Sequence, residues 1–318
     1  MRKPLIYSKR VGVILALLFY AILALFLYNA ASSINYSWKW DTIPKYFVYE
    51  KEDTLTSPCD GVLKVQKDAI KIVCEDKSIK EFKKDGYELK YKDGAFVYED
   101  DIFAVKKELK PGPLLLGMWV TIKISLISML IAFIIGLIVA IIRLSGIPAL
   151  DYIGSVYVTV IRGTPLLVQL FIFYFIVATI FDLPRFWAGV MSLSIFYGAY
   201  IAEILRGAIQ SIDKGQHEAA KSLGFNAWQR MELIILPQAL RKALPALVGE
   251  LISLIKDSSL VSIISITDLT KVGREIVANT FSPFETWITV ALLYLLLTSI
   301  LSFIGHKWEK KMKLRGGM

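Results

Sequence analysis

Two long apolar segments constrain the fold of this chain more than any other feature of its sequence. Val11 to Tyr28 contains no charged residue, and Leu114 to Ile142 contains Lys123 as its sole charge. The second segment exceeds the roughly 20 residues that a helix needs to cross the hydrocarbon core of a bilayer. The segments exclude a pair of soluble domains, a disordered chain and a collagen-like chain. The sequence therefore predicts a polytopic membrane protein.

Further apolar runs, separated by turn residues, bring the predicted membrane spans to six. They cover residues 11–29, 113–142, 150–181, 187–206, 238–258 and 284–306. The first run follows basic residues, as a signal peptide does, but its 18 apolar residues exceed the roughly 7–15 of a typical signal-peptide core. We favour an uncleaved anchor in residues 1–35. A signal peptide cleaved near Ala30-Ala31-Ser32 is the alternative.

The distribution of charge predicts the orientation of these spans. The chain has a net charge of +9, yet residues 38–110 hold 15 Lys against 16 Asp and Glu, so the surplus lies in the membrane part. Its cations flank the apolar runs: Arg2, Lys3, Lys9 and Arg10; Lys214, Lys221, Arg230, Arg241 and Lys242; and Lys307, Lys310, Lys311, Lys313 and Arg315. Lys and Arg gather on the cytoplasmic side of membrane proteins. Both termini and the loop between residues 206 and 242 are thus predicted to be cytoplasmic, which explains the charge better than nucleic-acid binding does.

Residues 36–112 form a different kind of region, with apolar residues recurring nearly every second position. The alternation is clear in residues 62–66, 70–74 and 87–91, and Asp-Gly pairs punctuate it. This pattern is typical of strands joined by tight turns. We expect a small antiparallel β module outside the membrane, ended by Pro111-Gly112-Pro113 where the second span begins.

The two cysteines of the chain, Cys59 and Cys74, both lie in this module. Outside the membrane a disulfide between them would persist, and closing the loop of about 15 residues would contribute roughly 3 kcal/mol in the chain-entropy model. A pair of buried, reduced thiols is the other reading of these residues.

Catalytic and metal-binding residues are scarce. The chain has two histidines, His217 and His306, on separate segments, and no cysteine or carboxylate cluster at ligand spacing. It also lacks a G-x-x-x-x-G-K-[ST] loop, the motif that cradles nucleotide phosphates. We expect a protein that is not an enzyme, and that by itself binds no metal, ATP or other cofactor.

The predicted cytoplasmic loop, residues 207–236, is too apolar for a solvated linker. Asp213 and Gln216 have the spacing of a helix cap and its partner, and Gly224 suits the end of that helix. Ala219, Ala220 and Leu223 are expected on one helical face.

Asn226 with Gln229 predicts the start of a second helix, which runs to the region of Pro237. This helix-Gly-helix arrangement predicts a docking surface for a cytoplasmic protein. A DNA-binding helix-turn-helix is the weaker reading, because the flanking spans tether the loop to the bilayer.

Motifs in and around this loop resemble a known family. The sequence EAAKSLG, which begins at Glu218, followed by Leu236-Pro237, is similar to the coupling loop of binding-protein-dependent ABC importer permeases. The stretches RGTPLLVQLF, YGAYIAEILRGAIQSIDKGQ and KDSSLVSIISITDL resemble the branch that carries polar amino acids such as histidine, glutamate, glutamine, arginine and cystine. The resemblance covers residues 117–306.

The resemblance implies a fold and a division of the chain. We expect an all-α, MetI-like permease with a transmembrane domain of five helices in residues 113–310, containing the coupling loop at 207–236 and followed by a basic tail at 311–318. The anchor in 1–35 and the β-rich insert in 36–112 are not explained by the family. The insert either contacts the solute-binding protein, covers the entrance of the transport path or has no role in transport.

The resemblance also implies partners. In such importers a solute-binding protein delivers the amino acid, and two permease subunits, identical or related, form the path in the prokaryotic inner membrane. Two ATPase subunits bind ATP and Mg²⁺ and act through the coupling helix. Gln216, Glu218, Ala219, Ala220, Gly224 and Pro237 match the coupling motif or its helix.

Polar groups inside apolar spans are costly and are therefore candidates for the substrate path. Glu203 is the sharpest, either facing the ammonium group of an amino acid or pairing structurally with Arg206. Arg162, before Gly163-Thr164-Pro165, either borders the cavity of the substrate path or marks a kink in the helix. Gln169, a few residues later, is the third candidate. Lys123, Glu250, Lys256 and Asp257 are weaker candidates.

Two other functions would also suit a chain with six spans. A secondary transporter is expected to show internal repeats, which are not found, and it needs no coupling loop. A membrane-anchored sensor would explain the insert and leave the loop unexplained. An importer permease accounts for more of the sequence than either.

Overall fold

The computed structural model describes residues 9–33 and 36–315 of the chain, which divides into two units, residues 1–42 and 43–318. The first unit contains helix α1, Lys9–Ser32. Its apolar segment Val11–Ala30 has no buried residue within the unit and is long enough to cross a membrane. Trp38 and Trp40 follow, and their rings stack with centroids 5.9 Å apart. A short 3-10 helix, η2, then covers Trp40–Tyr46.

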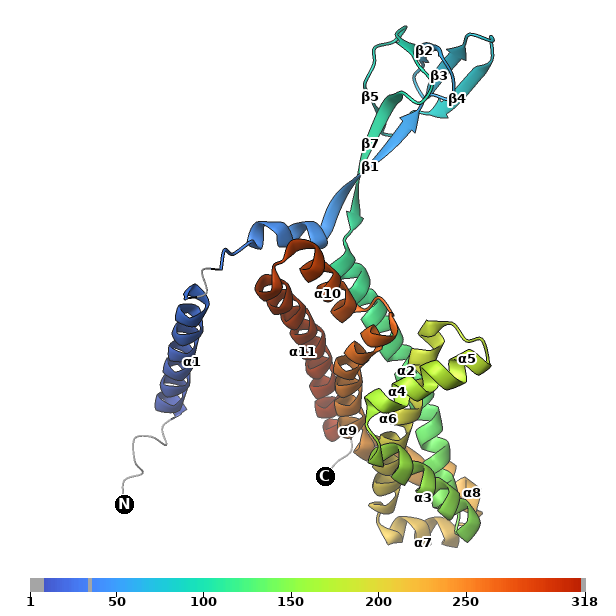
Figure 1. The fold of residues 1–318 in the computed structure, drawn as a ribbon. Coiled ribbons are helices and arrows are strands. Elements are labelled where there is room, and N and C mark those ends of the chain that lie inside the picture. The colour runs from blue at the N-terminus through green and yellow to red at the C-terminus, as the bar shows by residue number, and fades with distance from the viewer. Residues whose placement is uncertain (1–8, 34–35, 316–318) are drawn as a thin grey trace. The chain divides into compact units, whose positions relative to one another are not determined.

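The β module at the start of the second unit consists of two antiparallel sheets (Figure 1). The strands are β1 Val48–Thr56, β2 Gly61–Val65, β3 Ala69–Cys74, β4 Ile79–Lys83, β5 Glu88–Leu89, β6 Phe96–Val97 and β7 Ile102–Pro111. One sheet has the order β1-β7-β5 and the other β4-β3-β2-β6. The alternating segments near residues 62–66 and 70–74 are confirmed as β2 and β3. The predicted strand at 87–91 is reduced to the two residues of β5.

The core of the β module follows the period-2 pattern of its sequence. In β3, Ile70, Ile72 and Cys74 are buried, and the residues between them are not. These side chains pack with Leu63 of β2 and Phe103 of β7. A disulfide joins Cys59 to Cys74, whose Cα atoms are 5.8 Å apart. The loop before β2 is thereby linked to the last residue of β3.

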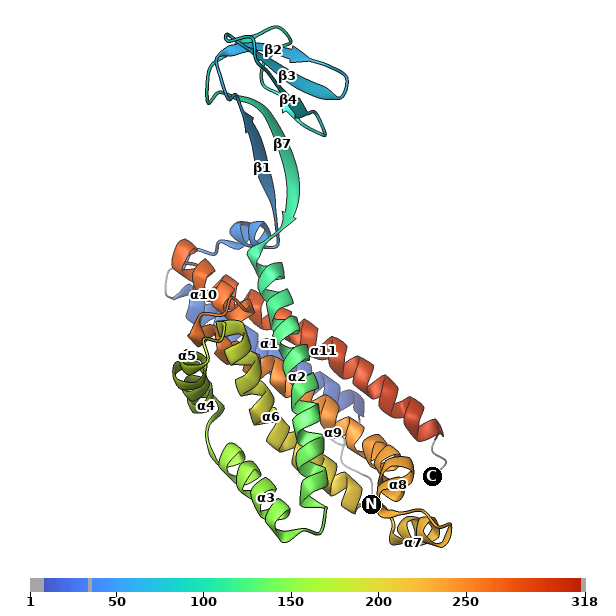
Figure 2. The ribbon, with the colours of Figure 1, turned by 90° about the vertical axis from the view of Figure 1, so that its right-hand side faces the viewer.

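The rest of the second unit is helical (Figure 2). Its elements are α2 Pro113–Arg143, α3 Pro148–Gly163, α4 Leu166–Ile172, η3 Phe173–Val177, α5 Ala178–Ile180, α6 Arg185–Gln210, α7 Lys214–Ser222, α8 Ala227–Arg230, η4 Met231–Ile235, α9 Leu236–Asp257, η5 Ser258–Ile264, α10 Leu269–Thr280 and α11 Pro283–Arg315. As predicted, α2 begins directly after Pro111-Gly112. Gly112 is extended, and Pro113 occupies the first turn, where its missing N–H costs nothing.

Four helices among the described residues are long and apolar enough to cross a membrane, namely α1, α2, α6 and α11. They coincide with four of the six predicted spans, which are thus confirmed as long apolar helices. The fifth, predicted over residues 238–258, coincides with α9, but Arg241, Lys242 and three further charged residues make that helix less apolar. That α9 crosses the membrane stays a prediction.

The span predicted over residues 150–181 is not one straight helix, and whether it crosses the membrane stays a prediction. The chain breaks after Gly163, and α3 meets the helices that follow at an angle of 107°. Thr164 is extended, as expected for a residue before proline, and Pro165 has no N–H to continue the helix. The segment is therefore a bent pair of helices.

Small side chains hold α2 against α6. The buried positions of α2 recur every three or four residues and are mostly small, including Ser125, Ser128, Ala132 and Gly136. A Cβ on Gly136 would lie 2.6 Å from the Ile201 side chain of α6. Helices surrounded by lipid associate through such close approach, because lipid tails are as apolar as the helices themselves.

Candidate functional site

The segment between α6 and α9 begins with α7, and both ends of this helix are capped by local chemistry. The Asp213 side chain accepts a hydrogen bond from the Gly215 N–H, 2.7 Å away. At the other end Gly224 has a φ of +81°. The Gly224 N–H donates to Lys221 and the Phe225 N–H to Ala220, which is the Schellman pattern of helix ends. The roles predicted for Asp213 and Gly224 as helix caps are confirmed.

Gln216 was expected to complete the cap of α7, and this detail is wrong. Its side-chain oxygen instead accepts from Gln238 Nε2 of α9, 3.2 Å away. Lys242 Nζ, one turn further along α9, donates to the Ser211 carbonyl. These two contacts attach α7 and the chain before it to α9. Polar contacts with α9 therefore orient α7.

The second helix begins as predicted, with a reciprocal capping box between Asn226 and Gln229. The prediction that this helix ends near Pro237 is wrong. A π-helical turn, η4, separates α8 from α9, and the helix continues through Pro237 to Asp257. Proline in a regular helix loses a hydrogen bond and meets the preceding turn. The wider turn placed just before it is one way that helices accommodate this.

The surface of this segment is apolar where it faces away from the rest of the chain. Ala220 is 1% exposed, but Leu223, Trp228 and Leu233 are 75%, 64% and 58% exposed. Glu218 and Ala219 are also exposed. Of Ala219, Ala220 and Leu223, which were predicted on one helical face, Ala220 alone is buried within the chain. We call residues 213–236 the coupling segment below.

Glu203 of α6 lies between two arginines. One carboxylate oxygen accepts from Arg143 Nη1, at the end of α2, and the other accepts from Arg206 Nη2 at 2.8 Å. Arg143 Nε also lies 3.6 Å from Asp151 of α3. The pairing with Arg206 was one of the two readings of the sequence. The second partner, Arg143, was not foreseen, since it lies 60 residues away in the chain.

Gln169 of α4 braces the break after α3. Its Nε2 donates to the Ile161 carbonyl and to Thr164 Oγ1, both at 2.7 Å. In a regular helix the Ile161 carbonyl would accept from residue 165, but Pro165 has no N–H. Gln169 supplies the missing donor and is buried, with 7% of its surface exposed. The structure thus places this side chain against the backbone.

Arg162 lies within a group of polar side chains from three helices. Its guanidinium stands 5.0 Å from the centre of the Tyr200 ring of α6. Glu250 of α9 is half-buried and within electrostatic reach of Arg162 and Asp257. The Tyr197 hydroxyl donates to Asp257 at 2.7 Å. We call these five residues the polar group. Glu250 and Asp257 were weaker candidates from the sequence, although their spacing of seven residues puts both on one helix face.

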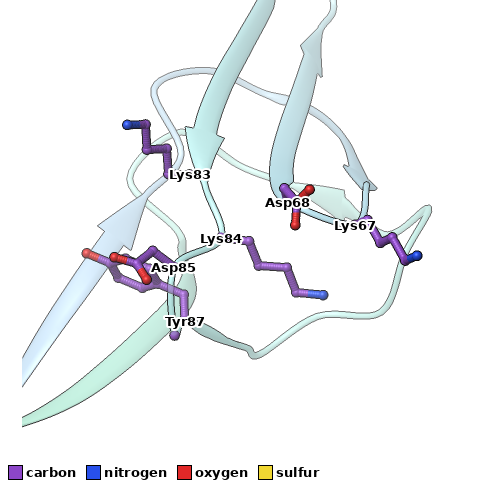
Figure 3. A pocket seen from close by; sticks show the side chains of 7 residues that line it. Lys67, Asp68, Lys83, Lys84, Asp85 and Tyr87 are labelled. Carbon is purple, nitrogen blue, oxygen red and sulfur yellow. The ribbon is translucent and has the colours of Figure 1, made fainter.

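Charged side chains also line an open cavity of about 620 Å³ in the β module. Figure 3 shows that they come from the β2–β3 turn, with Lys67 and Asp68, and from the end of β4 and the chain after it, with Lys83, Lys84 and Asp85. Tyr87 at its border donates to Asp53, which raises the pKa of the tyrosine. Within residues 9–33 and 36–315, no three His, Cys, Asp or Glu side chains are grouped to hold a metal ion.

Comparisons with known proteins give the family. Residues 114–314 match the family described as binding-protein-dependent transport system inner membrane component. The glutamine transport system permease protein GlnP of Escherichia coli (strain K12) is 41% identical over 206 residues, which cover 64% of this chain and 94% of that protein. The arginine transport system permease protein ArtQ of Bacillus subtilis (strain 168) is 39% identical over 199 residues, covering 62% and 91%.

Solved structures agree with this assignment. The crystal structure of an amino acid ABC transporter with histidines is 38% identical, with a TM-score of 0.58, and the match covers 63% of this chain and 94% of that one. An inward-facing MetNI methionine ABC transporter, 22% identical with a TM-score of 0.57, shares the fold over 63% and 96%. The helices from α2 onward thus have the MetI-like permease fold. Because the family match covers more than half of the chain, this protein belongs to the family of binding-protein-dependent transport system inner membrane components.

Proposed function

We propose that this chain is the permease subunit of an ATP-driven importer of polar amino acids, with glutamine and arginine as the first substrates to try. The relatives named for glutamine and arginine transport support this substrate class. The similar solved structure is that of an amino acid ABC transporter. The family assignment favours this function over a secondary transporter or a membrane-anchored sensor.

The exposed coupling segment supports the proposal that a separate ATPase subunit binds here and uses the ATP. Leu223, Trp228 and Leu233 are more than half exposed on a segment whose helix ends are fixed by caps. Exposed apolar side chains grouped in this way mark interaction sites. An ATPase subunit, holding ATP and Mg²⁺, is the occupant that this family requires. Glu218 and Ala219 on the exposed side of α7 would meet it, and Gly224 would let the chain turn beside it.

The polar group is our proposal for the substrate path. A free amino acid carries a carboxylate and an ammonium group, so a site for it needs a cation and an anion close together. Arg162 supplies the first, and Glu250 with Asp257 supplies the second. Of the three path candidates from sequence, Arg162 is the one we retain, because Glu203 and Gln169 are engaged by neighbouring groups.

The remaining proposals concern assembly and topology. A second permease subunit, identical or related, completes the path, and a solute-binding protein delivers the amino acid from outside. We place both termini and the coupling segment in the cytoplasm of a prokaryotic cell, with six spans that include α9 and the bent pair. The β module then lies outside, where the disulfide between Cys59 and Cys74 persists.

The experiment is Gly224→Asp, in the permease co-expressed with its ATPase and reconstituted in vesicles. An aspartate at φ +81° is strained and sets a charge beside the exposed apolar residues. We expect normal membrane levels, but loss of ATP-driven glutamine and arginine uptake and of ATPase co-purification.

The matched control is Gly94→Asp, because Gly94 also has a positive φ, +82°, and open space around it, but lies in the β module. This variant should keep uptake. Undiminished uptake by Gly224→Asp would contradict the proposal.

A further inference from the structure

Four charged side chains form a connected network where α2, α3 and α6 meet. Arg143 ends α2 and pairs with Asp151 in the first turn of α3 and with Glu203 of α6. Arg206 pairs with the other oxygen of Glu203. Two guanidinium groups face two carboxylates, so the network is neutral as a whole. The Arg143 and Glu203 side chains are 13% and 22% exposed, so water screens their interaction only in part.

The packing of α3 leaves space for this network. A Cβ on Gly154 would lie 2.5 Å from Cγ of Arg143 and 3.0 Å from its Cδ. The stem of Arg143 therefore crosses α3 at the one position of that turn without a side chain. Close packing at Gly154 is independent of the ion pairs, and it points to the same arrangement of Arg143.

The network continues toward the coupling segment. Arg206 Nη1 donates to Gln210 Oε1 at 2.9 Å, and Gln210 is the last residue of α6. The next residue, Ser211, accepts from Lys242 of α9, and Asp213 caps α7. An unbroken chain of polar contacts and backbone thus leads from α2 and α3 to the start of α7.

We propose that Arg143 and Glu203 are positioning residues that make the ends of α2, α3 and α6 move as one body with the coupling segment. This inference rests on the proposed function, because the motion it transmits is that of a docked ATPase. Both oxygens of Glu203 are held by arginine, so the carboxylate fixes the position of helices and does not select substrate. Removing Glu203 leaves the partly buried Arg143 with Asp151 alone, and removing Arg143 leaves Glu203 with Arg206 alone. Breaking up a partly buried set of ion pairs in this way is unfavourable.

The test measures how many amino acids enter per ATP hydrolysed, in vesicles holding the complete transporter, with labelled glutamine and arginine as the probes. The variants are Glu203→Gln, Arg143→Met and the double variant. We expect each to reduce the number imported per ATP about tenfold, within the range of coupling changes seen for residues between two sites. The double variant should lose no more than either single one, because the two residues act as a pair.

Further variants keep the test decisive if Glu203→Gln does not reach the membrane. Glu203→Asp keeps the charge and should restore much of the import per ATP. Gly154→Ala displaces the Arg143 stem without removing a charge and should lower the import per ATP. The matched control is Glu275→Gln, an exposed carboxylate paired with Lys271 at 3.6 Å, which should leave import per ATP unchanged.

The outcomes separate this inference from the proposed function. An unchanged import per ATP in Glu203→Gln, or a KM that rises for arginine and not for glutamine, would overturn the positioning role. Additive losses in the double variant would do the same. If Gly224→Asp keeps ATP-driven uptake, the proposed function fails. If Gly224→Asp loses uptake while Glu203→Gln keeps normal coupling, only the present inference fails.

Discussion

The β module and the helical bundle of this protein are stabilised by opposite means. On the ribbon of β1 and β7, three successive rungs place a lysine opposite a carboxylate, as at Lys51 and Glu108 or Glu52 and Lys107. In α2, by contrast, the buried positions are mostly small residues such as Gly117 and Ser128. One region places charges in water, and the other brings helix backbones close together.

The difference follows from the solvent that each region meets. In water, burying apolar side chains such as Phe103 and Ile72 is favourable, but a module with so small a core gains from a disulfide as well. In lipid, the apolar side chains are already away from water, so burying them between helices adds no hydrophobic stabilisation. Helices are held together there by close contact and by polar pairs. The ion pairs of Glu203 and the glycine contacts of α2 therefore do for the bundle what the core and the disulfide do for the module.

The largest expected effect comes from removing the disulfide. Replacing Cys59 and Cys74 with serine frees a loop of 15 residues and should destabilise the β module by about 3 kcal/mol in the chain-entropy model. We expect hydrogen–deuterium exchange in β2 and β3 to rise by roughly two orders of magnitude. Exchange in α2 and α6 should not change.

The control for this prediction is the unmodified protein treated with a reductant that reaches the module. It should show the same pattern of exchange. Faster exchange in α2 after loss of the disulfide would show that the β module and the helical bundle are not stabilised separately.

A large side chain at a helix contact is expected to damage the bundle and spare the module. Gly136→Leu places side-chain atoms where a Cβ alone would come within 2.6 Å of Ile201. Overpacking of this kind costs roughly 1–3 kcal/mol, so the melting temperature in detergent should fall. Gly12→Leu, in the apolar helix α1 with open space around the glycine, should have little effect. Equal melting temperatures for the two variants would contradict close packing at Gly136.

The features that the sequence predicted are those with a local cause. The spans follow from runs of apolar residues, and the caps of α7 and α8 follow from Asp213, Gly224 and Asn226, each acting on its neighbours within a few residues. The core strands β2 and β3 follow from alternation. Strand β1 was missed because almost all of its residues are exposed, so it shows no alternation.

The features that the sequence could not predict depend on residues far apart in the chain. Glu203 has Arg143 as its partner because α2 and α6 pack together, and neither residue signals the other. The same holds for Arg162 and Glu250. The sequence around Thr164-Pro165 predicted either a break beside a cavity or a kink, and the apolar residues on both sides could not decide between them. The helices meet there at 107°, and Gln169, eight residues after Ile161, donates to the Ile161 carbonyl.

The smallest expected effect tests the charges of the ribbon. Lys106 lies 3.0 Å from Glu108 and 3.7 Å from Asp85, and its hydrogen bond with Glu108 lowers the pKa of that carboxyl below its usual value of 4.5. A carboxyl whose pKa is lowered by folding stabilises the fold above its unfolded pKa, and this contribution is lost as the pH falls through the folded pKa. Protection of the ribbon against hydrogen exchange should therefore decrease below pH 4.5.

Lys106→Met should flatten that dependence on pH, once exchange is corrected for its intrinsic variation, and added salt should weaken the dependence in the unmodified protein because the pair is exposed. Lys107→Met is the control, since Lys107 meets Glu50 and Glu52 at 4.0 and 3.8 Å on the other face of the ribbon. It should leave the dependence in place. If Lys106→Met behaves like the unmodified protein, the ribbon is held by its backbone pairing alone. The contrast with the bundle would then lie in the core and the disulfide, and not in the surface charges.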